Sequence, residues 1–159
     1  RDRSPSRGLG DVYKRQVWVG LACLLASGCR GADPDSPEAR RQAVFKQMLV
    51  SSEELGGMLR GRLAFKPERF AEGARELNAL AARPWQYFPP PAGDERSTAR
   101  PEVWEQHARF EAFAQQLQVA TEALQSAAGR PQGSVDQLQP ALGRVEAACK
   151  RCHEAFRAY

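Results

Sequence analysis

The segment Cys149-Lys-Arg-Cys152-His153 holds two thiols and an imidazole within five residues near the C-terminal end of the chain. Residues three and four positions apart lie on one face of an α-helix, so Cys149 would share its face with both Cys152 and His153. Groups at this spacing could bind a metal ion, act as a redox dithiol or attach a haem. This motif is therefore the first candidate for the chemistry of the protein.

These three kinds of site place different demands on the rest of the chain. A structural zinc ion needs four ligands, but His107 is the one other histidine, and the remaining two cysteines fall in an N-terminal leader. A redox dithiol usually lies at a helix N-terminus, where the dipole lowers the thiol pKa, whereas this motif falls at a C-terminal end.

A c-type haem uses every group of the motif. Two thiols form thioethers with the vinyl groups, and the neighbouring imidazole binds the iron. The spacing favours one covalent haem c attached through Cys149 and Cys152, with His153 as the axial iron ligand. Zinc and a redox dithiol remain the alternatives.

Three amphipathic helices are expected upstream of the helix that carries the motif. The first spans about residues 37–60, and the second begins at Pro67, a residue favoured in the first turn. The third spans about residues 101–128 and ends before Gly129, which acts as a C-terminal cap. Residues 84–91 contain four prolines, so a long ordered loop is predicted between the second and third helices.

A fourth helix carries the motif. Ser134 and Gln137 form a capping-box signal at its start. Pro140 lacks an amide hydrogen, so we expect either a kink there or a short turn over 134–139 with the main helix starting at Pro140. No segment shows the alternation of a strand. The sequence therefore predicts an all-α fold, an antiparallel four-helix bundle.

Each helix has a stripe with spacings of three and four that should face the core. The predicted stripes are Phe45, Met48, Leu49, Ser52, Leu55 and Leu59 in the first helix; Phe70, Ala74, Leu77 and Ala81 in the second; Gln106, Phe110, Phe113, Leu117, Ala120, Leu124 and Ala127 in the third; and Val135, Leu138, Leu142, Val145, Cys149, Cys152 and Phe156 in the fourth.

The N-terminal region is expected to lie outside the folded domain. Residues 1–16 resemble an adapter-derived, non-native leader, and the apolar run 17–26 follows Lys14-Arg15 and precedes small residues, as in a secretory signal peptide. The run is too short to span a bilayer. Cys29 ends a stretch similar to a lipoprotein cleavage site, so we expect either a lipid anchor there or plain cleavage nearby. The predicted parts are leader and signal (1–29), linker (30–37) and bundle (38–159).

The formal charge of +4 belongs to this leader. Residues 1–30 hold six basic and two acidic residues, which leaves 17 of the 23 basic and 17 of the 19 acidic residues beyond Arg30. A near-neutral folded part argues against nucleic-acid binding. Paired carboxylates, a nucleophile–base set and a phosphate-binding loop are not recognised, so the protein is not expected to be an enzyme.

The chain resembles the cytochrome c′ family, the class II bundle of c-type cytochromes, over residues 38–159. The resemblance rests on "RQAVFKQM", "LGGMLRG", "RPEVW" and "CKRCHEAFR". It implies a left-twisted antiparallel bundle, usually homodimeric, with haem c between the helices near the C-terminus. It also implies that Arg41 and Gln42 lie against the haem propionates, that Thr98 contacts the haem, and that Arg157 lies beside the proximal imidazole.

Phe45 occupies the position that decides the iron coordination in this resemblance. Some members carry a methionine there as sixth ligand, whereas others carry an apolar side chain. Because a phenyl ring has no lone pair, Phe45 implies a distal cap over five-coordinate, high-spin iron that binds nitric oxide or a similar small gas.

The alternative is a six-coordinate, low-spin electron carrier with Met48 or His107 as sixth ligand.

Gly56 and Gly57 weaken a helix, so they indicate a close approach to haem or to a partner helix. The expected location is the periplasm, either free or lipid-anchored, and the expected partners are a gas ligand, a redox protein and a second copy of the chain.

Overall fold

The computed structural model describes residues 33–90, 97–130 and 134–158. Four long helices dominate these ranges: α2 (Pro37–Leu59), α3 (Pro67–Ala81), α5 (His107–Ala128) and α6 (Val135–Phe156). A 3-10 turn, η1 (Trp85–Tyr87), and the short α4 (Glu102–Glu105) lie between α3 and α5. The predicted leader and signal sequence, with Cys29, fall outside the described residues.

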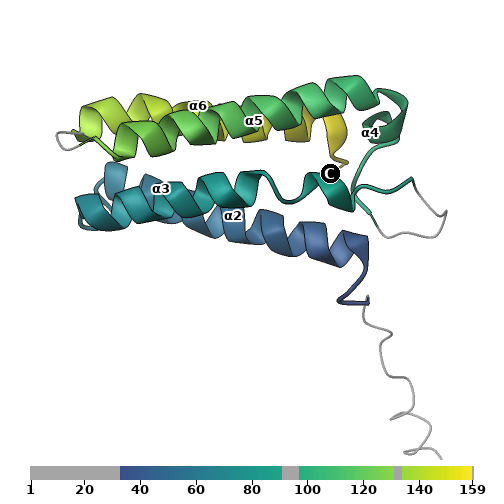
Figure 1. The fold of residues 1–159 in the computed structure, drawn as a ribbon, viewed down its shortest axis with the longest axis horizontal. Helices are drawn as coiled ribbons and strands as arrows, with labels where there is room; N and C mark the ends of the chain where they lie inside the picture. The colour runs from purple at the N-terminus through teal and green to yellow at the C-terminus, as the bar shows by residue number, and fades with distance from the viewer. Residues whose placement is uncertain (1–32, 91–96, 131–133, 159) are drawn as a thin grey trace, which may run out of the picture. The chain divides into compact units, whose positions relative to one another are not determined.

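The long helices form an antiparallel four-helix bundle, as predicted. Helix α2 packs against α3 and α6, while α5 packs against the same two helices, which closes the ring. Figure 1 shows α2 beside α3 and α5 beside α6, with α4 at one end of the bundle. Within the described residues, no helix is both long and apolar enough to cross a membrane.

Helix α2 begins where its local sequence predicts. The Ser36 hydroxyl accepts a hydrogen bond from the Ala39 amide at 3.1 Å and caps the helix, and Pro37 follows in the first turn. Gly61 ends this region with a φ of 72°, a conformation that favours glycine. The helix ends at Leu59, next to the predicted boundary.

The predicted core stripe of α2 is partly wrong. Leu49 is 57% exposed, and the stripe that faces the core consists of Arg41, Val44, Met48, Ser51 and Leu55. Met48 and Leu55 belong to both sets, and Leu59 is buried as predicted. The buried stripe therefore overlaps the predicted one and is shifted towards the side of Arg41, Val44 and Ser51. Apolar side chains lie on two faces of α2, so their pattern did not identify the buried face.

The third predicted helix is broken at Gln106. This residue has φ −116° and ψ 44°, and it separates α4 from α5. Its backbone carbonyl accepts hydrogen bonds from the amides of Arg109 and Phe110 and so caps the first turn of α5. Gln106 is exposed, so its prediction as a core residue is wrong. Helix α5 does end at Gly129.

Helix α6 runs without interruption through Pro140, so the expected helix start at that residue is wrong. Pro140 lies in the second turn, where its missing N–H removes one helical hydrogen bond, to Asp136, close to an end that lacks such bonds anyway. Ser134 is the N-cap as predicted, but its side chain makes no capping hydrogen bond. The start of α6 therefore depends on packing more than on a capping box.

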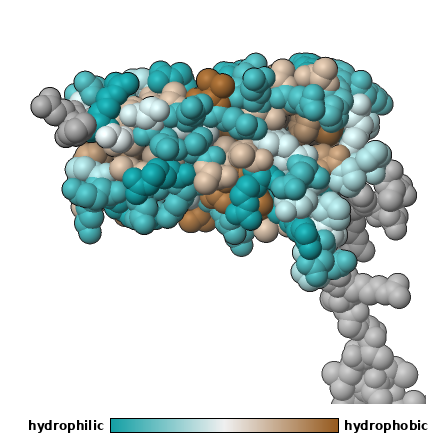
Figure 2. Space-filling model, viewed as in Figure 1, coloured by the Kyte–Doolittle hydropathy of each residue, from teal (hydrophilic) through white to brown (hydrophobic). Residues whose placement is uncertain are grey.

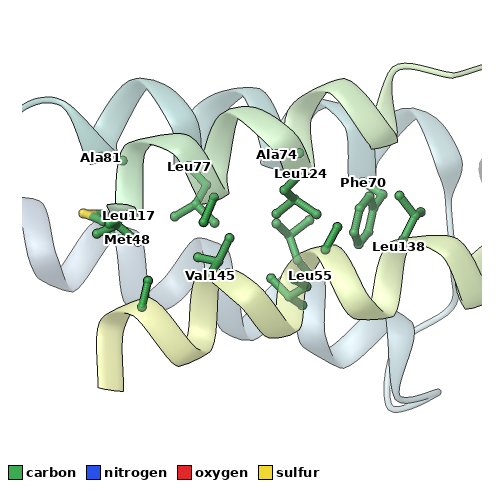
Figure 3. Packing of buried hydrophobic residues seen from close by; sticks show 14 of the residues in the cluster. Met48, Leu55, Phe70, Ala74, Leu77, Ala81, Leu117, Leu124, Leu138 and Val145 are labelled. Atoms are coloured by element: carbon green, nitrogen blue, oxygen red, sulfur yellow. The ribbon is translucent and has the colours of Figure 1, made fainter. Parts of the chain in front are cut away.

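The main core cluster combines side chains from all four long helices (Figure 3). Phe70, Leu55, Leu77, Leu124 and Val145 are each at most 1% exposed. The outer surface in Figure 2 is mostly hydrophilic, with separate apolar areas. The exposed large apolar residues are Leu49, Val50, Leu63 and Val119.

Two glycines of α2 make room for other side chains of the same region. A Cβ atom at Gly56 would collide with the Arg60 guanidinium, which reaches across to Glu146 on α6. A Cβ atom at Gly57 would meet Leu63 at 3.0 Å. Both contacts are with side chains that follow closely in the chain, so the close approach of a partner helix predicted for these glycines is wrong.

Candidate functional site

Cys149 and Cys152 lie at the junction of the two apolar clusters of the bundle. Cys149 packs against the main core cluster, whereas Cys152 packs against a second cluster of Val103, Phe110 and Phe156. Both cysteines are half-buried and neither forms a disulfide. As predicted, one face of α6 carries both sulfur atoms towards the interior of the bundle.

The ionisation of the motif does not favour a reactive dithiol. Burial raises the pKa of the Cys149 thiol, and burial followed by the proximity of Cys149 raises the pKa of Cys152 to about 11. Burial and then the positive charge of Arg157 lower the pKa of His153. At neutral pH the thiols are therefore protonated and the imidazole is neutral, with a lone pair available for a metal.

The motif also does not supply the ligand set of a structural zinc ion. In the ranges 33–90, 97–130 and 134–158, no three His, Cys, Asp or Glu side chains are grouped so that they could hold a metal ion. His107, the extra ligand considered for zinc, lies on the surface with its Nδ1 3.6 Å from the Glu111 carboxylate.

Arg41 is a buried cation whose contacts are with neutral groups. Its side chain is 4% exposed and donates to the Tyr87 carbonyl at 2.9 Å and to the Ser97 hydroxyl at 2.7 Å. Its guanidinium carbon lies 4.8 Å from the centre of the Phe88 ring. Within the described parts of the chain, no carboxylate lies within salt-bridge distance of Arg41. Such a cation suits a bound carboxylate, since buried charges are stable only when paired.

Gln42 and Thr98, the other predicted contacts of the carboxylates and the haem, are both exposed. The Gln42 amide donates to the Glu38 carboxylate one turn away, at 3.1 Å. Thr98 accepts a hydrogen bond from the Ala158 amide through its backbone carbonyl, at 2.8 Å. The structure thus places Arg41 alone of these three in a buried network.

Phe45 is half-buried on α2 and faces aromatic side chains of the α3–α4 connection. Its ring centre lies 6.0 Å from that of Trp85 and 6.4 Å from that of Phe88, both in edge-to-face geometry. Trp85 and Phe88 in turn contact Phe110, which contacts Phe156 on α6. A continuous set of edge-to-face aromatic contacts therefore runs from α2 to the C-terminal end of α6.

Arg157 follows α6 directly. Its backbone amide donates to the His153 carbonyl at 3.0 Å, and its backbone forms an isolated antiparallel bridge with Ala99. Its side chain is exposed at the same end of α6 as the motif. The loop around Ala99 thus pairs with the backbone of residues 156–158, just after the motif.

Met48, considered as an iron ligand, is part of the core. It is 5% exposed and belongs to the main cluster, as does Met58. Sequence reasoning missed Trp85, Tyr87, Phe88 and Ser97, which surround Arg41 and Phe45. The cluster of aromatic residues in "WQYF" was the available signal, because three aromatic side chains in a proline-rich loop are seldom left in solvent.

The comparisons with known proteins identify one family over most of the chain. The family model described as Cytochrome C' matches residues 37–157. A cytochrome c′ from Alcaligenes xylosoxydans xylosoxydans is 32% identical over 126 residues, which cover 79% of this chain and 96% of that protein.

Two solved structures of a cytochrome c prime from Alcaligenes xylosoxidans are also similar. A nitric oxide complex of one variant has a TM-score of 0.71 and 31% identity, and the match covers 82% of this chain and 99% of that chain. A carbon monoxide-bound variant also has a TM-score of 0.71 and 31% identity, with 80% and 98% covered.

Proposed function

The chain belongs to the cytochrome c′ family, whose members carry one covalently bound haem c and are not enzymes, and we propose that it is a five-coordinate, high-spin haem protein that binds nitric oxide or a similar small gas. The packing of Phe45 carries this proposal. Its ring contacts Trp85 and Phe88 and has no lone pair to offer to iron.

Cys149, Cys152 and His153 would hold the haem. The two half-buried thiols are one helical turn apart, which suits two thioether bonds on one face, and the neutral imidazole of His153 is suited to be the axial ligand. When bound, the haem supplies an iron atom with one coordination position available to a diatomic molecule.

Arg41 would bind a haem propionate. Its guanidinium is buried, is held by neutral acceptors and lies beside an aromatic ring, so a carboxylate there would gain a charge-assisted hydrogen bond. Gln42 and Thr98 would add weaker contacts from the exposed rim.

Phe45 and Arg157 would control the two faces of the iron. Phe45 would cap the distal face with hydrocarbon, which offers no hydrogen-bond donor to stabilise bound dioxygen, whereas nitric oxide binds without such a donor. Arg157 would lie by the proximal imidazole and could donate to a ligand on that side. The nitric oxide and carbon monoxide complexes of similar proteins support this choice of ligand.

Absorption spectroscopy of the purified ferrous protein tests this function. We expect a high-spin spectrum that changes when carbon monoxide or nitric oxide is added. A sharp six-coordinate spectrum that does not respond to carbon monoxide would contradict it. A pyridine haemochrome assay should detect covalent haem in the parent protein, reduced attachment in Cys149→Ser or Cys152→Ser, and none in the double variant.

A second candidate is a six-coordinate carrier of single electrons, with Met48 or His107 as sixth ligand. The burial of Met48 in the main cluster and the surface position of His107 both count against it. If it were correct, the low-spin spectrum would become high-spin in Met48→Leu or in His107→Ala. Under the leading proposal both variants keep the parent spectrum.

The same proposal includes export to the periplasm, a redox partner protein and a homodimer. The charged flank and short apolar run of residues 14–26 support export. Expression in a bacterium with haem-attachment machinery, followed by fractionation and mass measurement, should give a periplasmic protein that begins at or near Cys29. An added diacylglycerol would show that Cys29 is the lipid anchor, and sedimentation should give twice the monomer mass.

A further inference from the structure

Ser97 connects α2 to the segment before α4. Its hydroxyl accepts a hydrogen bond from Nη2 of Arg41 at 2.7 Å and another from the backbone amide of Ala99 at 3.0 Å. Ser97 is half-buried, and Arg41 is one of the few charged residues inside the bundle. One hydroxyl thus joins a buried cation to the backbone of a loop.

That loop is attached to the end of α6. Residues 97–100, here called the strap, pair with residues 156–158: the Arg100 amide donates to the Phe156 carbonyl at 2.9 Å, and the Ala158 amide donates to the Thr98 carbonyl at 2.8 Å. These two bonds flank the bridge between Ala99 and Arg157. The strap is therefore fixed to residues 156–158, which follow His153 closely in the chain.

Each terminal nitrogen of the Arg41 guanidinium has its own hydrogen-bond acceptor. Nη1 donates to the Tyr87 carbonyl, and Nη2 donates to Ser97. Without the Ser97 acceptor, Nη2 would have no hydrogen bond to any of the residues that the structure describes. Because an arginine side chain has many rotamers available when its hydrogen bonds do not fix it, the guanidinium would then become less well ordered.

We propose that Ser97 is a positioning residue: its hydroxyl orients Arg41 towards the haem propionate and, through Ala99, holds the strap on the end of α6. This inference rests on the proposed function. A cation fixed near the haem stabilises the ferrous state, which carries one positive charge less than the ferric state, and so raises the midpoint potential. A less well ordered Arg41 stabilises the ferrous state less, so the midpoint potential falls.

The test compares Ser97→Ala with Ser97→Thr, which keeps the hydroxyl, and with Ser126→Ala, a serine replacement at an exposed position of α5. Redox titration of the haem-loaded proteins gives the midpoint potential, and hydrogen–deuterium exchange with mass spectrometry follows residues 97–100 and 156–158. We expect Ser97→Ala to lower the potential and to speed exchange in both segments, while the two other variants match the parent.

A double variant shows whether Ser97 acts through Arg41. Arg41→Gln should lower the potential, and adding Ser97→Ala should produce no further shift. Unchanged potential and exchange in Ser97→Ala, or an undiminished shift in the Arg41→Gln background, would overturn the inference. A parent protein without covalent haem would overturn the proposed function instead, and the exchange measurement would still report whether Ser97 holds the strap.

Discussion

Ala99 and Arg157 lie opposite each other in an isolated antiparallel bridge, in a protein whose other regular structure is helical over the described residues. The hydrogen bonds from Arg100 to Phe156 and from Ala158 to Thr98 lie on either side of this pair. Ala99 and Arg157 therefore form a non-hydrogen-bonded antiparallel pair, in which the Cα atoms are close and both side chains project from the same face. The bridge therefore positions the residue four beyond His153.

Ala158→Pro should weaken this bridge. Proline has no N–H to donate to the Thr98 carbonyl, and Arg157, with φ −115° and ψ 130°, already has a backbone conformation that tolerates a following proline. Loss of one hydrogen bond should cost about 1 kcal/mol. Thermal unfolding of Ala158→Pro should show a small decrease in the melting temperature, and the Arg100 amide should exchange its hydrogen faster. Ala158→Gly keeps the N–H, so it should not show this faster exchange.

Thr121→Val should destabilise the bundle strongly. Thr121 is fully buried, and its hydroxyl, which has one hydrogen to donate, lies 2.9 Å from both the Asn78 side-chain oxygen and the Gln118 carbonyl. The Asn78 amide donates to Gln125 at 2.7 Å. Valine has a similar shape but leaves the Asn78 oxygen without this donor, at a cost of about 1–3 kcal/mol. Urea unfolding measures the change. Thr121→Ser keeps the hydroxyl and removes only the methyl group, so it should keep the hydrogen bond to Asn78. An unchanged free energy of unfolding in Thr121→Val would contradict the prediction.

Phe45→Met should convert the iron to six-coordinate, low-spin form, because a thioether placed on the distal side offers the lone pair that phenylalanine lacks. The ferrous absorption spectrum should sharpen, and its response to carbon monoxide should weaken. Phe45→Leu is the matched control, since it changes the side chain but supplies no ligand. A high-spin spectrum in Phe45→Met would place Phe45 away from the iron.

Glu54→Gln should make the protein less sensitive to acid. Glu54 accepts two hydrogen bonds from Arg69, at 2.8 and 2.6 Å, and these bonds lower the pKa of the Glu54 carboxyl. Because the folded-state pKa is below the unfolded one, the stabilisation is present above the unfolded pKa and is lost as pH falls through the folded pKa. The melting temperature of the parent should therefore fall more between pH 6 and about pH 3 than that of Glu54→Gln.

Glu53→Gln is the control for this acid dependence. Glu53 is exposed and next to Glu54 in sequence, so its replacement should leave the slope of the melting temperature with pH close to that of the parent. Equal slopes in the parent and in Glu54→Gln would show that the Glu54–Arg69 pair adds no stability. The pair is partly exposed, so high salt should reduce the difference.

Local signals in the sequence determined the ends of most helices and the relative positions of the motif residues. Pro37, Pro67 and Gly129 act on their own turns of backbone, and the helix repeat alone puts Cys149 and Cys152 on one face. Such effects need no partner from elsewhere in the chain. The all-helical fold was predictable for the same reason.

Long-range contacts decided the rest. Leu49 and Val44 are both apolar, and packing against α3 and α6 selected the face that includes Val44. Arg41 became a buried cation because the Tyr87 carbonyl, the Phe88 ring and the Ser97 hydroxyl meet around it from a distant loop. Hydrogen bonds between residues far apart in the chain leave no periodic pattern in the sequence, so these contacts could be found only in the tertiary structure.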